Sequence, residues 1–155
     1  MEDFEYKFHK LLVKMSSNQG VQIKIHPHPN YRAFLSTYRS QLEKNGIQFC
    51  TTDLEKNISS STLLIAFASA VIRWSIDYGV RAINYDLFGY RYSDYSHYSS
   101  VIHAFTFKEL EQTCTALQTG EPPSESGNSS YRTSNGRSTM QYELQDPYDI
   151  IEEII

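Results

Sequence analysis

The sequence has few cysteines, no surplus of positive charge and no long apolar run. Its two cysteines, Cys50 and Cys114, lie far apart without metal-ligand spacing, and no signal peptide is visible, which indicates reduced thiols in a cytoplasmic protein. The net charge of -4 argues against a nucleic-acid binder, because no basic surplus could neutralise phosphates. The longest apolar run, "LLIAFASAVI" over Leu63–Ile72, is far too short to cross a bilayer. We therefore expect a cytoplasmic protein with no nucleic-acid partner and no transmembrane segment.

Motifs for common catalytic chemistry are also absent from the sequence. It has no Gly-rich phosphate loop, no cluster of metal ligands and no Ser-His-Asp pattern, so neither a metal nor a cofactor is predicted. The acidic side chains are too scattered to define a catalytic acid pair: Asp53, Asp77, Asp86 and Asp94.

What is present is an alternation of strand and helix patterns along a chain with room for one domain. The order favours an α/β domain, a Rossmann-like parallel sheet with flanking helices and right-handed crossovers. The segment "STLLIAF" is apolar without alternation, as in a strand that is buried on both faces. Predicted helices cover 2–15, 30–46, a short stretch from Asp53, 69–79 and 107–118, and predicted strands cover 21–25, 47–52, 61–67, 80–86 and 101–106.

The composition changes near Gly120, which divides the chain into three predicted parts. Residues 1–120 form the α/β domain, and 121–139 are rich in Ser, Gly, Asn and Pro, as in a flexible linker. Residues 140–155 include "DPYDIIEEII", which predicts an amphipathic C-terminal helix with an isoleucine stripe.

Three predicted strands end in residues that could bind a ligand. In parallel α/β sheets ligands bind outside the carboxyl ends of the strands, beside helix N-termini. The stretch "IKIHPHPN" ends the first strand abruptly, because each proline fixes the backbone. Together these ends would suit a phosphate or diphosphate that is attached to a base and a sugar. The candidate residues are Lys24, His26, Pro27 and His28 at the first end, Ser69 at the third, and Asn84, Tyr85 and Asp86 at the fourth.

Each candidate has a structural alternative. A histidine before a proline is more often a turn residue than a ligand contact, and Ser69 is more often a helix cap than a phosphate donor. The six tyrosines between Tyr78 and Tyr98 could cover the sheet edge and find partners for their hydroxyls. Spacing alone leaves both readings open.

In order and spacing, these pieces over 21–106 resemble the C-terminal, nucleotide-sugar-binding half of GT-B glycosyltransferases. The pattern is similar to bacterial sialyltransferases and to capsule or teichoic-acid polymer transferases, which carry a Lys-x-His-Pro strand end, here "KIHP". A strand that runs into a serine helix start follows, here "LLIAFASAVI", and then a strand with an aromatic loop, here "AINYD". The resemblance implies that His26 and Ser69 bind the donor phosphate, with Tyr85 and Asp86 close to the nucleotide.

The resemblance also implies how the charge of His26 would act. A histidine near a diphosphate would gain a proton and stabilise the leaving nucleotide, which makes His26 the catalytic candidate.

The chain departs from the family pattern in several places. Ala68-Ser69 keeps one hydroxyl of the serine pair, and no acid follows on that helix, where Arg73, Trp74 and Ser75 stand. Such transferases also have an N-terminal acceptor domain, which 155 residues do not encode. They have a strand before the first helix, at the centre of the sheet, and we expect the parallel sheet of this chain to lack that first central strand.

The sequence thus leaves several functions open. The first is the donor domain of a glycosyltransferase in surface polysaccharide or capsule biosynthesis, which binds a CMP-, UDP- or CDP-linked sugar and needs a separate acceptor domain. The second is a non-catalytic module that binds the nucleotide sugar. The third is a remnant whose exposed sheet centre is covered by a partner protein or by a second copy. A sugar epimerase ranks lower, because its usual Gly-Gly helix start is absent.

Overall fold

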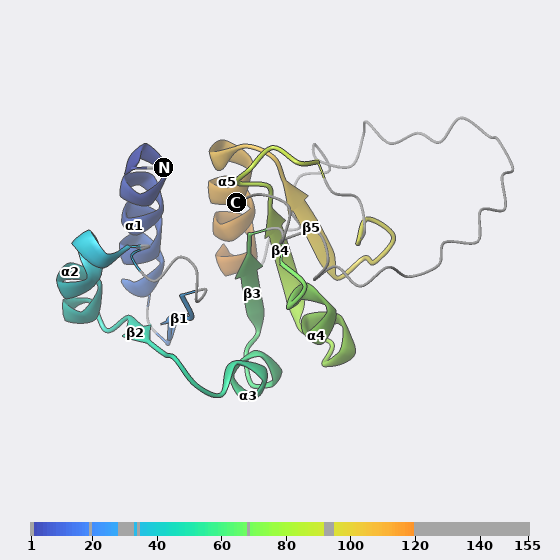
Figure 1. Ribbon diagram of the computed structural model, residues 1–155, viewed down its shortest axis with the longest axis horizontal. Coiled ribbons are helices and arrows are strands. Elements are labelled where there is room, and N and C mark those ends of the chain that lie inside the picture. The colour runs from blue at the N-terminus through green and yellow to red at the C-terminus, as the bar shows by residue number, and fades with distance from the viewer. Residues whose placement is uncertain are drawn as a thin grey trace, which may run out of the picture.

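The fold is described from a computed structural model of the chain (Figure 1). It describes residues 2–18, 20–27, 33, 35–67, 69–91 and 95–119. The predicted linker over 121–139 and the predicted helix over 140–155 lie outside the described residues, as does His28.

Helices and strands alternate in the described chain as the sequence predicts, although most strands are shorter than expected. The elements in order are α1 (Glu2–Ser16), β1 (Lys24–Ile25), the 3-10 helix η2 (Ser36–Tyr38), α2 (Arg39–Lys44), β2 (Gln48–Phe49), α3 (Leu54–Ser59), β3 (Leu63–Ala66), α4 (Ile72–Asp77), β4 (Arg81–Tyr85), β5 (Val101–Ala104) and α5 (Phe107–Thr119).

The strands form two small parallel sheets instead of one. Strand β1 pairs with β2, and a second sheet has the order β3-β4-β5. Figure 1 shows the β1–β2 pair lying apart from β3, next to α1 and α2. The chain is therefore a mixed α/β protein with parallel sheets, as predicted, but its sheet is interrupted between β1 and β3.

Alternating side chains give the three-stranded sheet two apolar faces. On one face, Ile65 and Ile83 pack into a core that α1 and α5 cover, and the Lys14 ammonium lies 3.6 Å from the Glu111 carboxylate across these two helices. On the other face, Ala82 belongs to a smaller core that includes Ile72 of α4. The sheet is thus sandwiched between helices, which is the layer arrangement typical of α/β proteins.

Two glycines end their helices as the sequence predicts. Gly46 has φ +78° and Gly79 has φ +67°, values that suit glycine because it has no Cβ. The N–H of the next residue then bonds back into the helix, Ile47 to the Leu42 carbonyl at 3.1 Å and Val80 to a carbonyl of α4 at 2.7 Å. Both following residues are buried, so each turn feeds the chain directly into a strand.

The continuous helix predicted over 30–46 is wrong at Leu35 and in the 3-10 segment that follows it. Leu35 has φ +60°, a left-handed conformation that no α-helix contains, and regular helix begins only at Arg39. Leu35 is fully buried, and its N–H donates to the Glu5 carboxylate of α1 at 3.0 Å. Packing against α1 therefore overrides the helical pattern of the sequence at this position.

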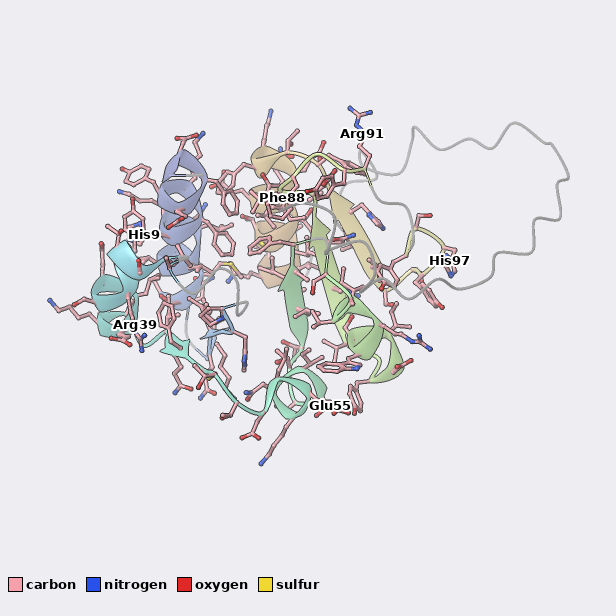
Figure 2. The ribbon with its side chains drawn as sticks, in the orientation of Figure 1. His9, Arg39, Glu55, Phe88, Arg91 and His97 are labelled. Atoms are coloured by element: carbon pink, nitrogen blue, oxygen red, sulfur yellow. The ribbon has the colours of Figure 1, made fainter. Side chains whose placement is uncertain are left out.

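A buried histidine on α1 belongs to the same contact between α1 and the segment that leads into α2. His9 lies on the side of α1 that faces α2 (Figure 2), and only 3% of its surface is exposed. Its ring stacks on Tyr38, with 4.5 Å between the ring centres. It serves the core and does not line any of the predicted strand ends.

No helix among the described residues combines the length and the apolar character that a membrane crossing requires. Cys50 and Cys114 are both free thiols.

Candidate functional site

The end of β1 carries a cluster of three polar side chains. Lys24 and His26 lie two residues apart, so they project to the same face of the strand, opposite Ile25. On that face the Lys24 ammonium donates to Oδ1 of Asn57 in α3 at 2.7 Å, and Nδ2 of Asn57 lies 3.1 Å from Nε2 of His26. The first strand end thus brings together two of its predicted residues through a third that the sequence did not single out.

Through Asn57, Lys24 determines which ring nitrogen of His26 carries the proton. An ammonium can only donate, so the Asn57 atom that it contacts must be the carbonyl oxygen, and the amide nitrogen must then face His26. That nitrogen also donates, so Nε2 of His26 accepts, and the ring proton resides on Nδ1. His26 is therefore neutral in this arrangement.

The surroundings of His26 favour the same state. Partial burial lowers the pKa of His26 from its usual value, and the positive charge of Lys24 lowers it further. His26 is thus uncharged at neutral pH when no anion is bound. A phosphate at this place would act in the opposite direction and favour the imidazolium.

Ser69 follows β3 but does not cap a helix as expected. Regular helix in α4 begins at Ile72, and the Ser69 hydroxyl accepts from the N–H of Val71 at 3.4 Å in the turn before it. The hydroxyl is half-buried and keeps its own proton available for donation.

The residues that end β4 serve the fold in different ways. Asn84 is 95% buried, and the Tyr85 ring stacks on Phe4 at 5.3 Å between ring centres, inside the main core. Burial and the charge of Asp86 raise the pKa of the Tyr85 hydroxyl, so it stays protonated at neutral pH. The Asp86 carboxylate accepts backbone N–H groups of the following loop, from Tyr90 at 2.9 Å and from Arg91 at 2.7 Å.

The predicted residues thus fall into two groups. Lys24 and His26 share one cluster, with Pro27 beside it half-buried, while Ser69 and Asn84–Asp86 follow strands of the other sheet. Among the described residues, no hydrogen bond or ion pair joins the two groups. The sequence could have suggested Asn57 only as a polar residue on the helix that precedes β3.

A separate hollow of about 490 Å³ lies between α1 and α5, and it contains none of the predicted residues. It is open, and Lys7 and Lys14 on its wall already pair with Asp3 and Glu111. We therefore place the candidate site at the strand ends and not at this hollow.

The described part of the chain shows no metal-binding cluster, and one of its two thiols, Cys114, is unreactive at neutral pH. No three His, Cys, Asp or Glu side chains converge there to hold a metal ion. Burial raises the pKa of the Cys114 thiol to about 12, so it is not a nucleophile at neutral pH.

Comparison with protein-family models, with curated proteins and with solved structures found no match, so the candidate site rests on its geometry and its residues.

Proposed function

We propose that this chain is the nucleotide-sugar-binding half of a GT-B-type glycosyltransferase, with a Rossmann-like arrangement of its strands. The observation that carries the proposal is the Lys24–Asn57–His26 cluster at the carboxyl end of a parallel strand. Such strand ends are where α/β proteins bind nucleotides. A cation and an imidazole on one face supply the charge and the hydrogen bond that a phosphate needs.

In the proposed reaction His26 changes its charge when the donor binds. The donor phosphate replaces water near Lys24 and His26, and its negative charge raises the pKa of the imidazole. The imidazolium then stabilises the negative charge that develops on the departing nucleotide as the bond between the sugar and phosphate breaks. The acceptor and the group that takes its proton come from a separate acceptor domain.

The other predicted residues take secondary parts in this proposal. Ser69 would donate its hydroxyl proton to the phosphate from the neighbouring sheet. Asn84, Tyr85 and Asp86 would lie near the nucleotide and set its position through the backbone and the loop that Asp86 holds. Pro27 would fix the backbone after His26, and His28 would be a further imidazole for the phosphate.

The first experiment is an amide NMR titration of the full chain with CMP, CDP and UDP. We expect one nucleotide to shift the resonances of Lys24, His26 and Asn57. His26→Ala should weaken that binding at least tenfold, because it removes a charge-assisted hydrogen bond worth about 1.5–3 kcal/mol. His97→Ala is the matched control, because His97 is exposed in the loop before β5 and far from this cluster (Figure 2). A folded spectrum that no nucleotide changes would end the proposal.

A non-catalytic binding module is the second candidate. The lack of a base at the cluster suits it as well as the first proposal, since no carboxylate among the described residues contacts Lys24, Asn57 or His26. The chain would then hold a nucleotide sugar without a base to activate an acceptor. Binding in the NMR titration, without transfer when an acceptor domain is added, would distinguish this module from an enzyme part.

A further inference from the structure

Strand β3 has the sequence of a central strand but the place of an edge strand. Leu63, Leu64 and Ile65 are consecutive apolar residues, a pattern that occurs where both faces and both edges of a strand are covered. Among the described residues, the sheet order β3-β4-β5 nevertheless leaves β3 with one neighbour, and these three side chains are only half-buried. An apolar edge of this kind is a template for pairing with another strand.

The backbone of β3 offers hydrogen-bonding groups at this edge. The N–H of Ala82 donates to the Ser100 carbonyl at 2.9 Å, so Ala82 faces β5 and its neighbour Ile83 faces β3. Ile83 lies opposite Ile65, and in a parallel ladder it bonds to the residues on either side of that partner. Leu64 therefore faces β4, and Ile65 turns its N–H and C=O toward the open edge.

Strand β1 shows the same feature on the other side of the break. The carbonyls of Ile23 and Ile25 accept from Gln48 at 2.9 Å and from Cys50 at 2.8 Å, so these residues face β2. The backbone groups of Lys24, between them, point away from β2. Among the described residues, no backbone hydrogen bond joins β1 to β3.

The core is continuous although the sheet is not. Ile23 and Ile25 beside β2, and Leu63, Ile65 and Phe67 along β3, all pack against the one cluster that α1 and α5 cover. In the described part of the chain, the facing edges of β1 and β3 are thus unpaired above one shared core, which fits a gap of one strand better than two independent sheets.

We infer that β3 is a docking site for an extended segment of a partner polypeptide, which adds as a strand and closes the break toward β1. The segment is apolar on both faces. One face packs on the main core, and the other lies on the face of the sheet that carries Leu64 and the smaller core. It runs parallel to β3, as every described strand pair does. This inference does not depend on the proposed nucleotide site.

Two other occupants fit less well. A second copy of the chain related by a two-fold axis would pair β3 with β3 in the antiparallel direction, unlike every described strand pair. The last apolar stretch of this chain, "DIIEEII", carries two glutamates at its centre, so it does not offer an apolar residue at every position.

The test uses amide hydrogen exchange on the full chain with a synthetic peptide. The probe has five alternating valine and isoleucine residues with two lysines at each end, and the control is the same peptide with every apolar amide N-methylated. We expect the probe to slow exchange of the Ile65 amide at least tenfold, while the control leaves it unchanged. The Leu64 amide, which faces β4, should be protected throughout and so reports that the chain stays folded.

Three results would overturn the inference. The first is a folded chain whose Ile65 amide exchanges at the same rate with and without saturating probe. The second is protection of Ile65 without probe at every protein concentration, which would mean that the chain covers its own edge. The third is protection that grows with protein concentration alone, which would assign the edge to a second copy.

Discussion

At the scale of single residues, Lys24 controls the chemistry of His26 through Asn57. The ammonium orients the amide, the amide occupies Nε2 of the imidazole, and the positive charge disfavours a second one nearby. None of these effects can be read from the spacing of "KIHP", because Asn57 is 31 residues away from His26 in the chain.

Replacing Lys24 should change the pKa of His26. In Lys24→Met we expect the pKa of His26 to rise part of the way toward 6.5, since burial, the larger cause of the lowering, remains. NMR titration of the His26 ring measures the change. Lys56→Met is the matched control, because it removes a lysine of α3 that does not contact this cluster, and an equal rise in both variants would contradict the assignment.

The lowered pKa of His26 also predicts the direction in which the stability of the fold changes with pH. The unfolded chain takes up a proton on His26 near pH 6.5, whereas the folded chain does so only at lower pH. Stability therefore falls as the pH drops from 6.5 through the lowered pKa of His26. The unfolding free energy from urea titrations at several pH values should fall less steeply for Lys24→Met than for the unaltered chain.

At the scale of single elements, α5 begins at a local signal in the sequence, whereas α2, α3 and α4 begin without a side-chain cap. The Thr106 hydroxyl accepts from the Glu109 N–H at 3.2 Å, and the Glu109 carboxylate accepts from the N–H groups of Phe105 and Thr106 at 2.7 and 3.1 Å. This is a capping box, a Thr-x-x-Glu pattern that is readable in the sequence before α5.

Removing the acidic partner of this box should weaken α5. We expect Glu109→Ala to lower the free energy of unfolding by about 1 kcal/mol, because two N–H groups at the helix start lose their acceptor. Urea unfolding followed by circular dichroism measures the loss. Lys108→Ala, an exposed neighbour, should change stability by less than about 0.5 kcal/mol. Equal effects of the two substitutions would show that the box contributes nothing.

At the scale of the whole molecule, one core joins two sheets. Phe8 is 5% exposed and packs with its ring centre 5.4 Å from that of Phe4 and 5.3 Å from that of Phe67, beside β3. These contacts tie α1 to the three-stranded sheet, and Ile25 and Phe49 of the β1–β2 pair pack against the same core cluster.

Truncating Phe8 should therefore destabilise the molecule as one unit. We expect Phe8→Ala to cost about 3–5 kcal/mol, the range for a buried phenylalanine. The transition followed by fluorescence of Trp74, on α4 at the other face of the sheet, should coincide with the transition followed by circular dichroism. Tyr6→Ala, at a half-exposed ring on the same helix, should cost less. Separate transitions would mean that the two sheets unfold independently.

Much of the element order could be predicted because it follows from local patterns. Helical spacing located α1 and α5, and Gly46 and Gly79 marked the ends of α2 and α4. The helix predicted over 30–46 failed at Leu35 because burial against α1 is not visible in a local window. The candidate site was found in part: Lys24 and His26 share a cluster, but their link through Asn57 depends on how α3 returns to β1.

The sequence by itself determined the mixed α/β class, the order of its elements, the helix ends at Gly46 and Gly79 and the start of α5 at its capping box, since these depend on neighbours within a few positions. Only the tertiary structure decided that the parallel sheet is broken between β1 and β3, that Tyr85 and Asp86 serve the core and a loop, and that Asn57 joins Lys24 to His26. The physical reason is that strand pairing, burial and charge depend on contacts between residues that are distant along the chain.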